Sequence, residues 1–181
     1  LVLGIKEKFK LFDYIENYDK KELSCIYRSP VEEAKDFGEA FSADTDSRTR
    51  AFLKIQDGCN YKCSFCTIPM ARGSSRSLEI SKIIDNANKI IDSGYKEIVL
   101  TGVNTGDYNF DIGEKNFRLI SVLEELEKLN IDRIRISSIE PNLLTDEIIS
   151  FVKTSTKFCN HFHIPMQSGD NEILKLMRRR Y

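Results

Sequence analysis

Apolar and polar positions recur with two different periods along most of the chain. Short apolar runs rich in β-branched residues predict strands at residues 51–56, 97–101, 133–137 and 161–165. Apolar side chains at helical spacing predict helices at residues 79–93, 117–129, 146–152 and 171–177. A strand followed by a helix, four times in succession, predicts an α/β protein with a parallel sheet or barrel.

The first 47 residues follow a different pattern. Residues 1–3 predict a short strand, and Phe9 and Phe12 belong to a set of apolar residues near helical spacing, which predicts a helix. Residues 16–47 are mostly polar and predict a linker with one paired strand near residues 25–27. A domain boundary is therefore expected near residues 40–48.

Unusual polar residues gather where the predicted strands end. They lie at residues 58–60, 102–104, 138–141 and 167–169. Parallel α/β folds bind their ligands at the carboxyl ends of the strands. Four separate segments therefore point to one binding site.

Composition narrows the class of protein. The chain has 181 residues, 41% hydrophobic and 30% charged, which is typical of a soluble globular protein rather than a disordered one. No apolar run approaches the roughly 20 residues that span a bilayer, and the start has no features of a signal peptide. The first residue is Leu1, so the chain is expected to be processed or an excerpt. A net charge of -1 gives no general argument for nucleic acid.

Three of the five cysteines crowd into eight residues, as Cys59, Cys63 and Cys66. An odd, crowded set is a poor disulfide framework and indicates a reducing, cytoplasmic setting. Three thiolates from one short loop can reach three corners of a cubane iron–sulfur cluster and leave the fourth iron open. A zinc site completed by His161 or His163, or three free thiols, remains an alternative.

The longer strings around these cysteines resemble the radical S-adenosylmethionine (SAM) methylthiotransferase family. The likeness lies in FLKIQDGCN at 52–60, CSFCTIP at 63–69, ARG at 71–73, LTGVN at 100–104, RIRISSIEP at 133–141 and HFHIPMQSGD at 161–170. The QDGC and ISSIEP strings are most like the branch that methylthiolates threonylcarbamoyladenosine next to the anticodon of tRNA. The alternatives within the family are another tRNA adenosine or a ribosomal protein; outside it, the alternative is a non-enzymatic zinc or iron–sulfur module.

The resemblance implies a cofactor set and the residues that hold it. Cys59, Cys63 and Cys66 would hold a [4Fe–4S] cluster whose open iron binds SAM. A deoxyadenosyl radical would abstract the hydrogen at C2 of the modified adenine before sulfur is inserted, and a second SAM would supply the methyl group. The implied contacts to SAM are Phe65, Gly102, Asn104, Ser138, Glu140 and Gln167. Arg72 is the candidate for holding an anionic group of the substrate.

The resemblance also implies what lies outside the chain. Residues 1–15 would be the remnant of an N-terminal α/β methylthiotransferase domain, 16–47 a linker, and 48–181 a partial TIM-like radical SAM barrel with about four βα units. A second [4Fe–4S] cluster is expected in the missing N-terminal domain. The implied partners are tRNA and an electron donor such as flavodoxin or ferredoxin, with neither DNA nor a membrane.

Overall fold

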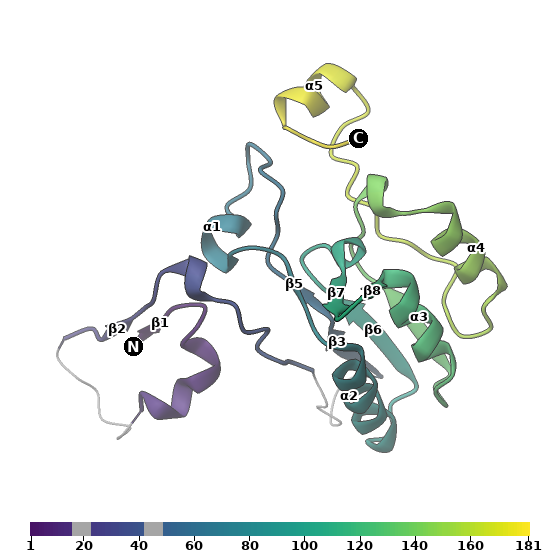
Figure 1. The fold of residues 1–181 in the computed structure, drawn as a ribbon, viewed down its shortest axis with the longest axis horizontal. Helices are drawn as coiled ribbons and strands as arrows, with labels where there is room; N and C mark the ends of the chain where they lie inside the picture. Colours follow the sequence, from purple (N-terminus) through teal and green to yellow (C-terminus); the bar gives the residue numbers. More distant parts are fainter. Residues whose placement is uncertain (16–22, 42–48) are drawn as a thin grey trace.

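The computed structural model describes residues 1–15, 23–41 and 49–181 (Figure 1). Its centre is a parallel sheet of three strands in the order β3-β6-β9, formed by Arg50–Lys54, Glu97–Thr101 and Arg133–Ile136. The register places Arg50 and Arg133 on either side of Glu97. The mixed α/β class with a parallel sheet is therefore confirmed.

Helices cover one face of this sheet. They are α2 (Ile80–Asp92), α3 (Leu119–Glu127) and α4 (Asp146–Thr154). Alternate strand residues such as Leu53, Leu100 and Ile134 are fully buried in one core with Ile83 and Leu123 of the helices. The period of two along the strands and of 3.6 along the helices brings these apolar sides together. The opposite face of the sheet carries charged residues such as Glu97 and Arg135 beside the apolar Phe52 and Val99.

Within residues 49–181 the helix boundaries agree closely with the sequence pattern, with one exception. Thr145 caps α4 as expected, because its Oγ1 accepts a hydrogen bond from the Ile148 N–H at 3.3 Å. The helix expected from residue 117 begins at Leu119 instead. Phe117 belongs to a hairpin of β7 (Asn109–Ile112) and β8 (Lys115–Arg118), which turns at Gly113 with φ of +58°.

The fourth predicted strand, at residues 161–165, is not formed. Two isolated parallel bridges take its place, one between Ile134 and Phe158 and one between Ser138 and His163. The His161 N–H donates to the carbonyl oxygen of Cys159 at 2.6 Å. Because this bond is local, that N–H does not take part in a hydrogen-bond ladder with a neighbouring strand. The following helix, α5 (Asn171–Leu176), is formed where it was expected.

The N-terminal segment has the expected strand but not the expected helix. β1 (Val2–Leu3) pairs in parallel with β2 (Ile26–Tyr27). Residues Lys8–Asp13 form a kinked 3₁₀ helix, η1, with no buried residue, and Phe12 is 78% exposed. The apolar spacing there therefore does not mark a core face. The expected linker and boundary, residues 16–47 and 40–48, lie partly outside the described residues.

Short elements complete the chain. Phe41 forms an antiparallel bridge with Leu53 and so covers part of the outer edge of β3. The remaining short elements are η2 (Val31–Glu33), β4 (Gln56–Asp57), α1 (Ile68–Arg72), β5 (Arg76–Ser77), η3 (Thr105–Asp107) and η4 (Pro141–Leu143). No helix of the described residues is long and apolar enough to cross a membrane.

Candidate functional site

The loop that carries the three cysteines leaves the sheet through Gly58. Its φ is +69°, and a Cβ built there would lie 2.1 Å from the carbonyl oxygen of Ser74. The backbone conformation and the close approach both require glycine. Asp57 supports the turn, since its Oδ1 accepts a hydrogen bond from the Gly58 N–H at 2.9 Å. The cysteine loop therefore starts from a fixed position.

The buried side chain of Gln56 joins this loop to the loop after β6. Its Nε2 donates to the carbonyl oxygen of Gly58 at 2.8 Å, and its Oε1 accepts from the N–H of Asn104 at 2.9 Å. A Cβ on Gly102 would lie 2.9 Å from the same Oε1. The sequence predicted Gly102 and Asn104 as site residues but gave no role to Gln56. The signal in the sequence that could have identified Gln56 was a polar amide among apolar residues at the end of a predicted buried strand.

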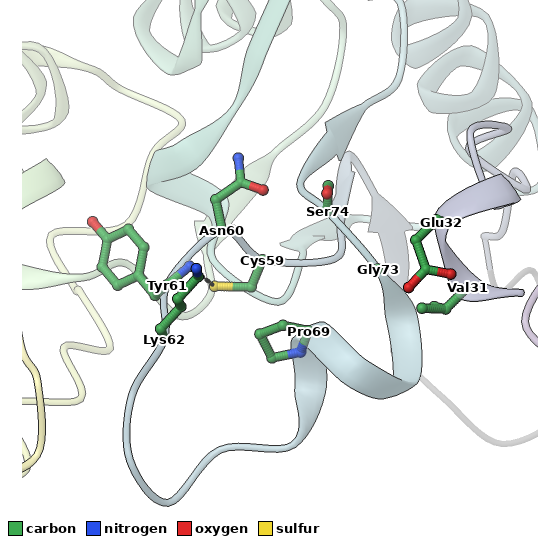
Figure 2. A pocket seen from close by; sticks show the side chains of 9 residues that line it. All are labelled: Val31, Glu32, Cys59, Asn60, Tyr61, Lys62, Pro69, Gly73 and Ser74. Atoms are coloured by element: carbon green, nitrogen blue, oxygen red, sulfur yellow. Dashed lines mark hydrogen bonds between the residues drawn. The ribbon is translucent and has the colours of Figure 1, made fainter.

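Cys59, Cys63 and Cys66 lie on one loop between β4 and α1. Cys63 is buried and the other two are half-buried. The Cys59 N–H donates to the carbonyl oxygen of Gly73 at 3.1 Å, and its Sγ accepts from the Tyr61 N–H at 3.4 Å (Figure 2). Burial raises the pKa of the Cys59 thiol, although the hydrogen bond from Tyr61 opposes this shift.

A pocket of about 220 Å³ opens beside Cys59 (Figure 2). Tyr61 and Lys62 line it from the cysteine loop, and Pro69 from α1. Val31 and Glu32 of η2 contribute the remaining side, together with residues 73 and 74. The Cys59 sulfur therefore borders open space instead of a packed core.

The cysteines do not converge as the ligands of a single ion would. Across residues 1–15, 23–41 and 49–181, no group of three His, Cys, Asp or Glu side chains is placed to hold one metal ion. His163 instead pairs its Nδ1 with the Ser138 Oγ at 2.9 Å. Zinc needs its ligands around one point, whereas the thiolates of a cubane cluster bind different irons. Three thiols on one loop supply the protein ligands of a cubane cluster, and His163, the candidate fourth zinc ligand, is paired with Ser138 instead.

Arg72 lies in a group of cations around the buried carboxylate of Asp57. Asp57 is 3.1 Å from Arg72 Nη1, 3.1 Å from Arg76 Nη2 and 3.4 Å from Lys54 Nζ. Burial alone would raise the pKa of Asp57, but the charge of Lys54 and the hydrogen bond from Arg72 bring that pKa below its ordinary value. The Arg72 side chain is 41% exposed, so it retains N–H groups that can bind an anion.

A second cleft, of about 390 Å³, lies between this group and the end of β6. Lys54, Asp57 and Arg72 line it on one side, and residues 101–103 on the other. The cleft therefore joins the predicted substrate residue Arg72 to the predicted cofactor residue Gly102.

Asn104 connects the loops that follow β6 and β9. Its Oδ1 accepts a hydrogen bond from the Glu140 N–H at 3.3 Å. Its Nδ2 is buried and has no acceptor among the described residues. The Oδ2 of Asp107 is also buried and has no donor among the described residues, and the charge of Asp107 contributes to raising the pKa of Cys59. A buried polar group without a partner destabilises the fold by about 1–3 kcal/mol. The unpaired donor on Asn104 and the unpaired acceptor on Asp107 are therefore suited to hydrogen-bond a polar ligand. The sequence did not single out Asp107.

The other predicted cofactor residues differ in how far the structure brings them into the site. Ser138 accepts from the Thr105 Oγ1 through its carbonyl oxygen at 2.7 Å. Glu140 forms an ion pair with a C-terminal arginine. Phe65 is 53% exposed, and Gln167 is exposed with φ of +64°. The structure ties Ser138 and Glu140 into the site and leaves the Phe65 and Gln167 side chains exposed.

The segment after α5 folds back over the cysteine loop. The Met177 carbonyl oxygen accepts a hydrogen bond from the Ser64 N–H at 3.1 Å. The Arg180 guanidinium lies 4.0 Å from the centre of the Tyr61 ring and donates to the carbonyl oxygen of Asn60 at 3.2 Å. Sequence spacing alone does not reveal this contact with a loop more than 100 residues earlier.

The family model of the radical SAM superfamily matches residues 53–181. The chain belongs to the radical SAM superfamily. This membership implies a [4Fe–4S] cluster and SAM as cofactors.

Curated relatives of this radical SAM chain include proteins of two different names. The "Threonylcarbamoyladenosine tRNA methylthiotransferase MtaB" of Bacillus subtilis (strain 168) is 44% identical over all of this chain and 40% of its own length. The "tRNA-2-methylthio-N(6)-dimethylallyladenosine synthase" of Clostridium tetani is 36% identical over all of this chain and 40% of its own length. The chain therefore spans about two-fifths of the length of such relatives.

Solved structures support the fold alone. The radical SAM methyltransferase TsrM from Kitasatospora setae aligns with a TM-score of 0.56 at 14% identity, over 69% of this chain and 23% of its own. The three-stranded parallel sheet with helices on one face is therefore part of a radical SAM fold.

Proposed function

We propose that this radical SAM chain is the core of an enzyme that adds a methylthio group to C2 of N6-threonylcarbamoyladenosine next to the anticodon of tRNA. The observation that carries the proposal is the 44% identity to the Bacillus subtilis relative over the whole chain, against 36% to the Clostridium tetani relative of the other name. Both matches include the residues before 53 that the superfamily match leaves out. A match to the superfamily alone would cover only residues 53–181, the part assigned to the barrel.

In this proposal the cysteine loop holds the cluster through Cys59, Cys63 and Cys66. The donor set fits, because three thiols lie on one loop whose start is fixed at Gly58 and whose Cys59 borders open space. When bound, the cluster and SAM supply the one-electron chemistry. The chain itself binds and orients the cofactors and the substrate and keeps water out of the site.

The proposed SAM contacts are Phe65 of the cysteine loop, the strand-end residues Gly102, Asn104, Ser138 and Glu140, and Gln167. The unpaired Asn104 Nδ2 supports this assignment, since an amide donor suits the carboxylate of the methionine part. The unpaired Asp107 carboxylate oxygen adds an acceptor suited to the amino group. Gln56 would keep these two loops in register, because it bonds to both.

Arg72 is proposed to hold an anionic group of the substrate. Its guanidinium is half-exposed at the edge of the cleft and belongs to a group of three cations that share one carboxylate. The excess positive charge favours an anion, such as a tRNA phosphate or the carboxylate of the threonyl group.

The proposal extends to parts outside the chain. Residues 1–15 would end an N-terminal domain that holds a second [4Fe–4S] cluster, residues 16–47 would link the domains, and residues 48–181 would form an incomplete radical SAM core. The enzyme would act in the cytoplasm and take electrons from a flavodoxin or ferredoxin.

Mass spectrometry of tRNA nucleosides tests the proposal. A strain that lacks the gene is expected to contain threonylcarbamoyladenosine without its methylthio group, and the wild-type gene restores the group. Cys59→Ala is expected not to restore it, whereas Cys159→Ala, outside the cysteine loop, does. Normal methylthiolation in the deletion strain would contradict the tRNA assignment.

A second candidate substrate is N6-dimethylallyladenosine in tRNA, because the Clostridium tetani relative carries that name. The same measurement separates the two. Loss of the methylthio group from dimethylallyladenosine, with threonylcarbamoyladenosine unaffected, would favour this second candidate.

A further inference from the structure

The Arg179 guanidinium is buried between two segments of the candidate site. Its side chain is 3% exposed. Nη1 donates to the Cys63 Sγ at 3.1 Å, and Nη2 forms an ion pair with Glu140, whose side chain is 13% exposed. A buried charge persists only where it is paired and hydrogen-bonded, and here one of the partners is a thiol of the cysteine loop.

The backbone after α5 orients this arginine. The Arg178 N–H donates to the carbonyl oxygen of Lys175 at 3.0 Å, and the Arg179 N–H donates to that of Leu174 at 3.0 Å. Arg178 has φ of +56°. This pair of bonds around a left-handed residue is the Schellman motif, which reverses the chain at a helix end. Arg179 therefore turns back toward the cysteine loop.

Tyr181 fixes the guanidinium from the other side. The Arg179 Nε donates to the Tyr181 hydroxyl at 3.1 Å, and that hydroxyl lies 2.9 Å from the carbonyl oxygen of Met166. The guanidinium carbon is 5.0 Å from the centre of the Tyr181 ring. With three of its nitrogens engaged, Arg179 has one defined orientation.

We propose that Arg179 is a positioning residue that hydrogen-bonds the cluster thiolate of Cys63 and so makes the cluster easier to reduce. The inference rests on the proposed function only in that Cys63 is a cluster ligand. Reduction adds one negative charge to the cluster. A cationic donor on a ligand sulfur stabilises the more negative state, and hydrogen bonds to the sulfurs are known determinants of cluster potential.

Glu140 has the opposite effect on the same equilibrium. Its carboxylate neutralises part of the charge that Arg179 places beside Cys63. Because both side chains are buried, solvent ions screen them only weakly. Removal of the carboxylate therefore favours the reduced cluster, and removal of the guanidinium disfavours it.

The test is a redox titration of the full-length protein, reconstituted anaerobically with iron and sulfide. Electron paramagnetic resonance follows the cluster whose signal SAM perturbs, and the midpoint potential is measured without SAM. Arg179→Gln is expected to lower the equilibrium constant for reduction about tenfold, equivalent to about 59 mV for one electron. Arg179→Lys, which keeps the charge, is expected to lower the midpoint potential by less. Glu140→Gln is expected to raise the midpoint potential.

Arg180→Gln is the matched control, because Arg180 contacts Asn60 and Tyr61 but no sulfur in the part of the chain that the structure describes. An equal shift in Arg180→Gln and Arg179→Gln, or no shift in Arg179→Gln, would overturn the inference. If Arg179→Gln binds no iron, the midpoint potential of Glu140→Gln is the deciding measurement. A potential that falls or does not change in that variant would overturn the inference. A wild-type protein that binds no cluster at the three cysteines would contradict the proposed function instead.

Discussion

At the scale of single residues, the buried carboxylate of Asp57 holds three cations together. Asp57→Asn leaves Lys54, Arg72 and Arg76 close together without their shared carboxylate. We expect a loss of about 3 kcal/mol of stability, since breaking a buried ion pair costs about 3–5 kcal/mol and Arg72 is partly exposed. Denaturant unfolding of the two full-length proteins at neutral pH measures it.

The same residue predicts a dependence of stability on pH. The folded pKa of Asp57 is below its ordinary value of 3.8, so its contribution is complete above that value and is lost as the pH falls through the folded pKa. Acid unfolding of the wild type is therefore expected to be steeper below about pH 4 than that of Asp57→Asn. Parallel acid curves would contradict this assignment.

Gly58 gives a prediction with an internal control. Gly58→Ala forces a Cβ to 2.1 Å from the Ser74 carbonyl oxygen at φ of +69°, whereas Gly94→Ala at φ of +85° meets nothing within 4 Å. Gly94→Ala is expected to cost about 1–2 kcal/mol from backbone strain alone. Gly58→Ala is expected to cost at least about 1 kcal/mol more, from overpacking, and to lower iron uptake. Thermal unfolding and iron content measure the two effects.

At the scale of elements, the end of α5 is strained. Arg178 occupies the left-handed position of a Schellman motif, where glycine is usual. Arg178→Gly is therefore expected to stabilise the protein by about 1 kcal/mol, since a left-handed side chain costs about 1–2 kcal/mol. Thermal unfolding should show a rise of about 2–4 °C for a domain of this size. Arg178→Ala, which keeps the strained Cβ, should show none.

The elements that the sequence predicted well are those with a sustained apolar period. β6 and α2 bury alternate or helically spaced residues in one core, and their bounds agree within a residue. The pattern failed where tertiary context decided. Phe117 fits a helical stripe but pairs in a hairpin, and residues 161–165 have strand-like composition but lose the ladder to a turn at Cys159.

The candidate site could be predicted from sequence only in its residue types. The spacing of Cys59, Cys63 and Cys66 indicates a shared ligand, but no pattern shows that Gln56 bonds to two loops or that Arg179 reaches Cys63. These contacts join segments 48 and 116 residues apart, and they depend on the strands being side by side. The spacing of residues within one segment carries no information about contacts between segments so far apart in the sequence.

At the scale of the whole molecule, a carboxylate lies among cations at each end of β6. Glu97 lies 3.3 Å from Arg135, 3.6 Å from Arg133 and 4.0 Å from Arg50, at the end opposite Asp57. Glu97→Gln is expected to destabilise the protein by about 1–2 kcal/mol at low salt, since hydrogen bonds to charged groups contribute about 1.5–3 kcal/mol and solvent screens these partly exposed arginines. At 1 M salt, where the Debye length is about 3 Å, the loss should be smaller.

Glu125→Gln is the control for this experiment. Its ion pair with Lys128 at 2.6 Å is solvent-exposed, with side chains 44% and 66% accessible. Such pairs contribute about 0–1 kcal/mol, so little change is expected at either salt concentration. Equal losses in the two variants would show that the position of Glu97 between three arginines has no special effect. Urea unfolding at the two salt concentrations makes the comparison.

The contact between Arg179 and Cys63 also has a consequence for synthesis on the ribosome. The two residues are 116 positions apart, and chains are made at about 5–20 residues per second. Cys63 is therefore translated roughly 6–23 s before the side chain that covers it. During that interval the thiol is open to oxidants and to iron donors alike. The order of translation thus sets a period in which the loop is accessible and after which the C-terminal segment closes over it.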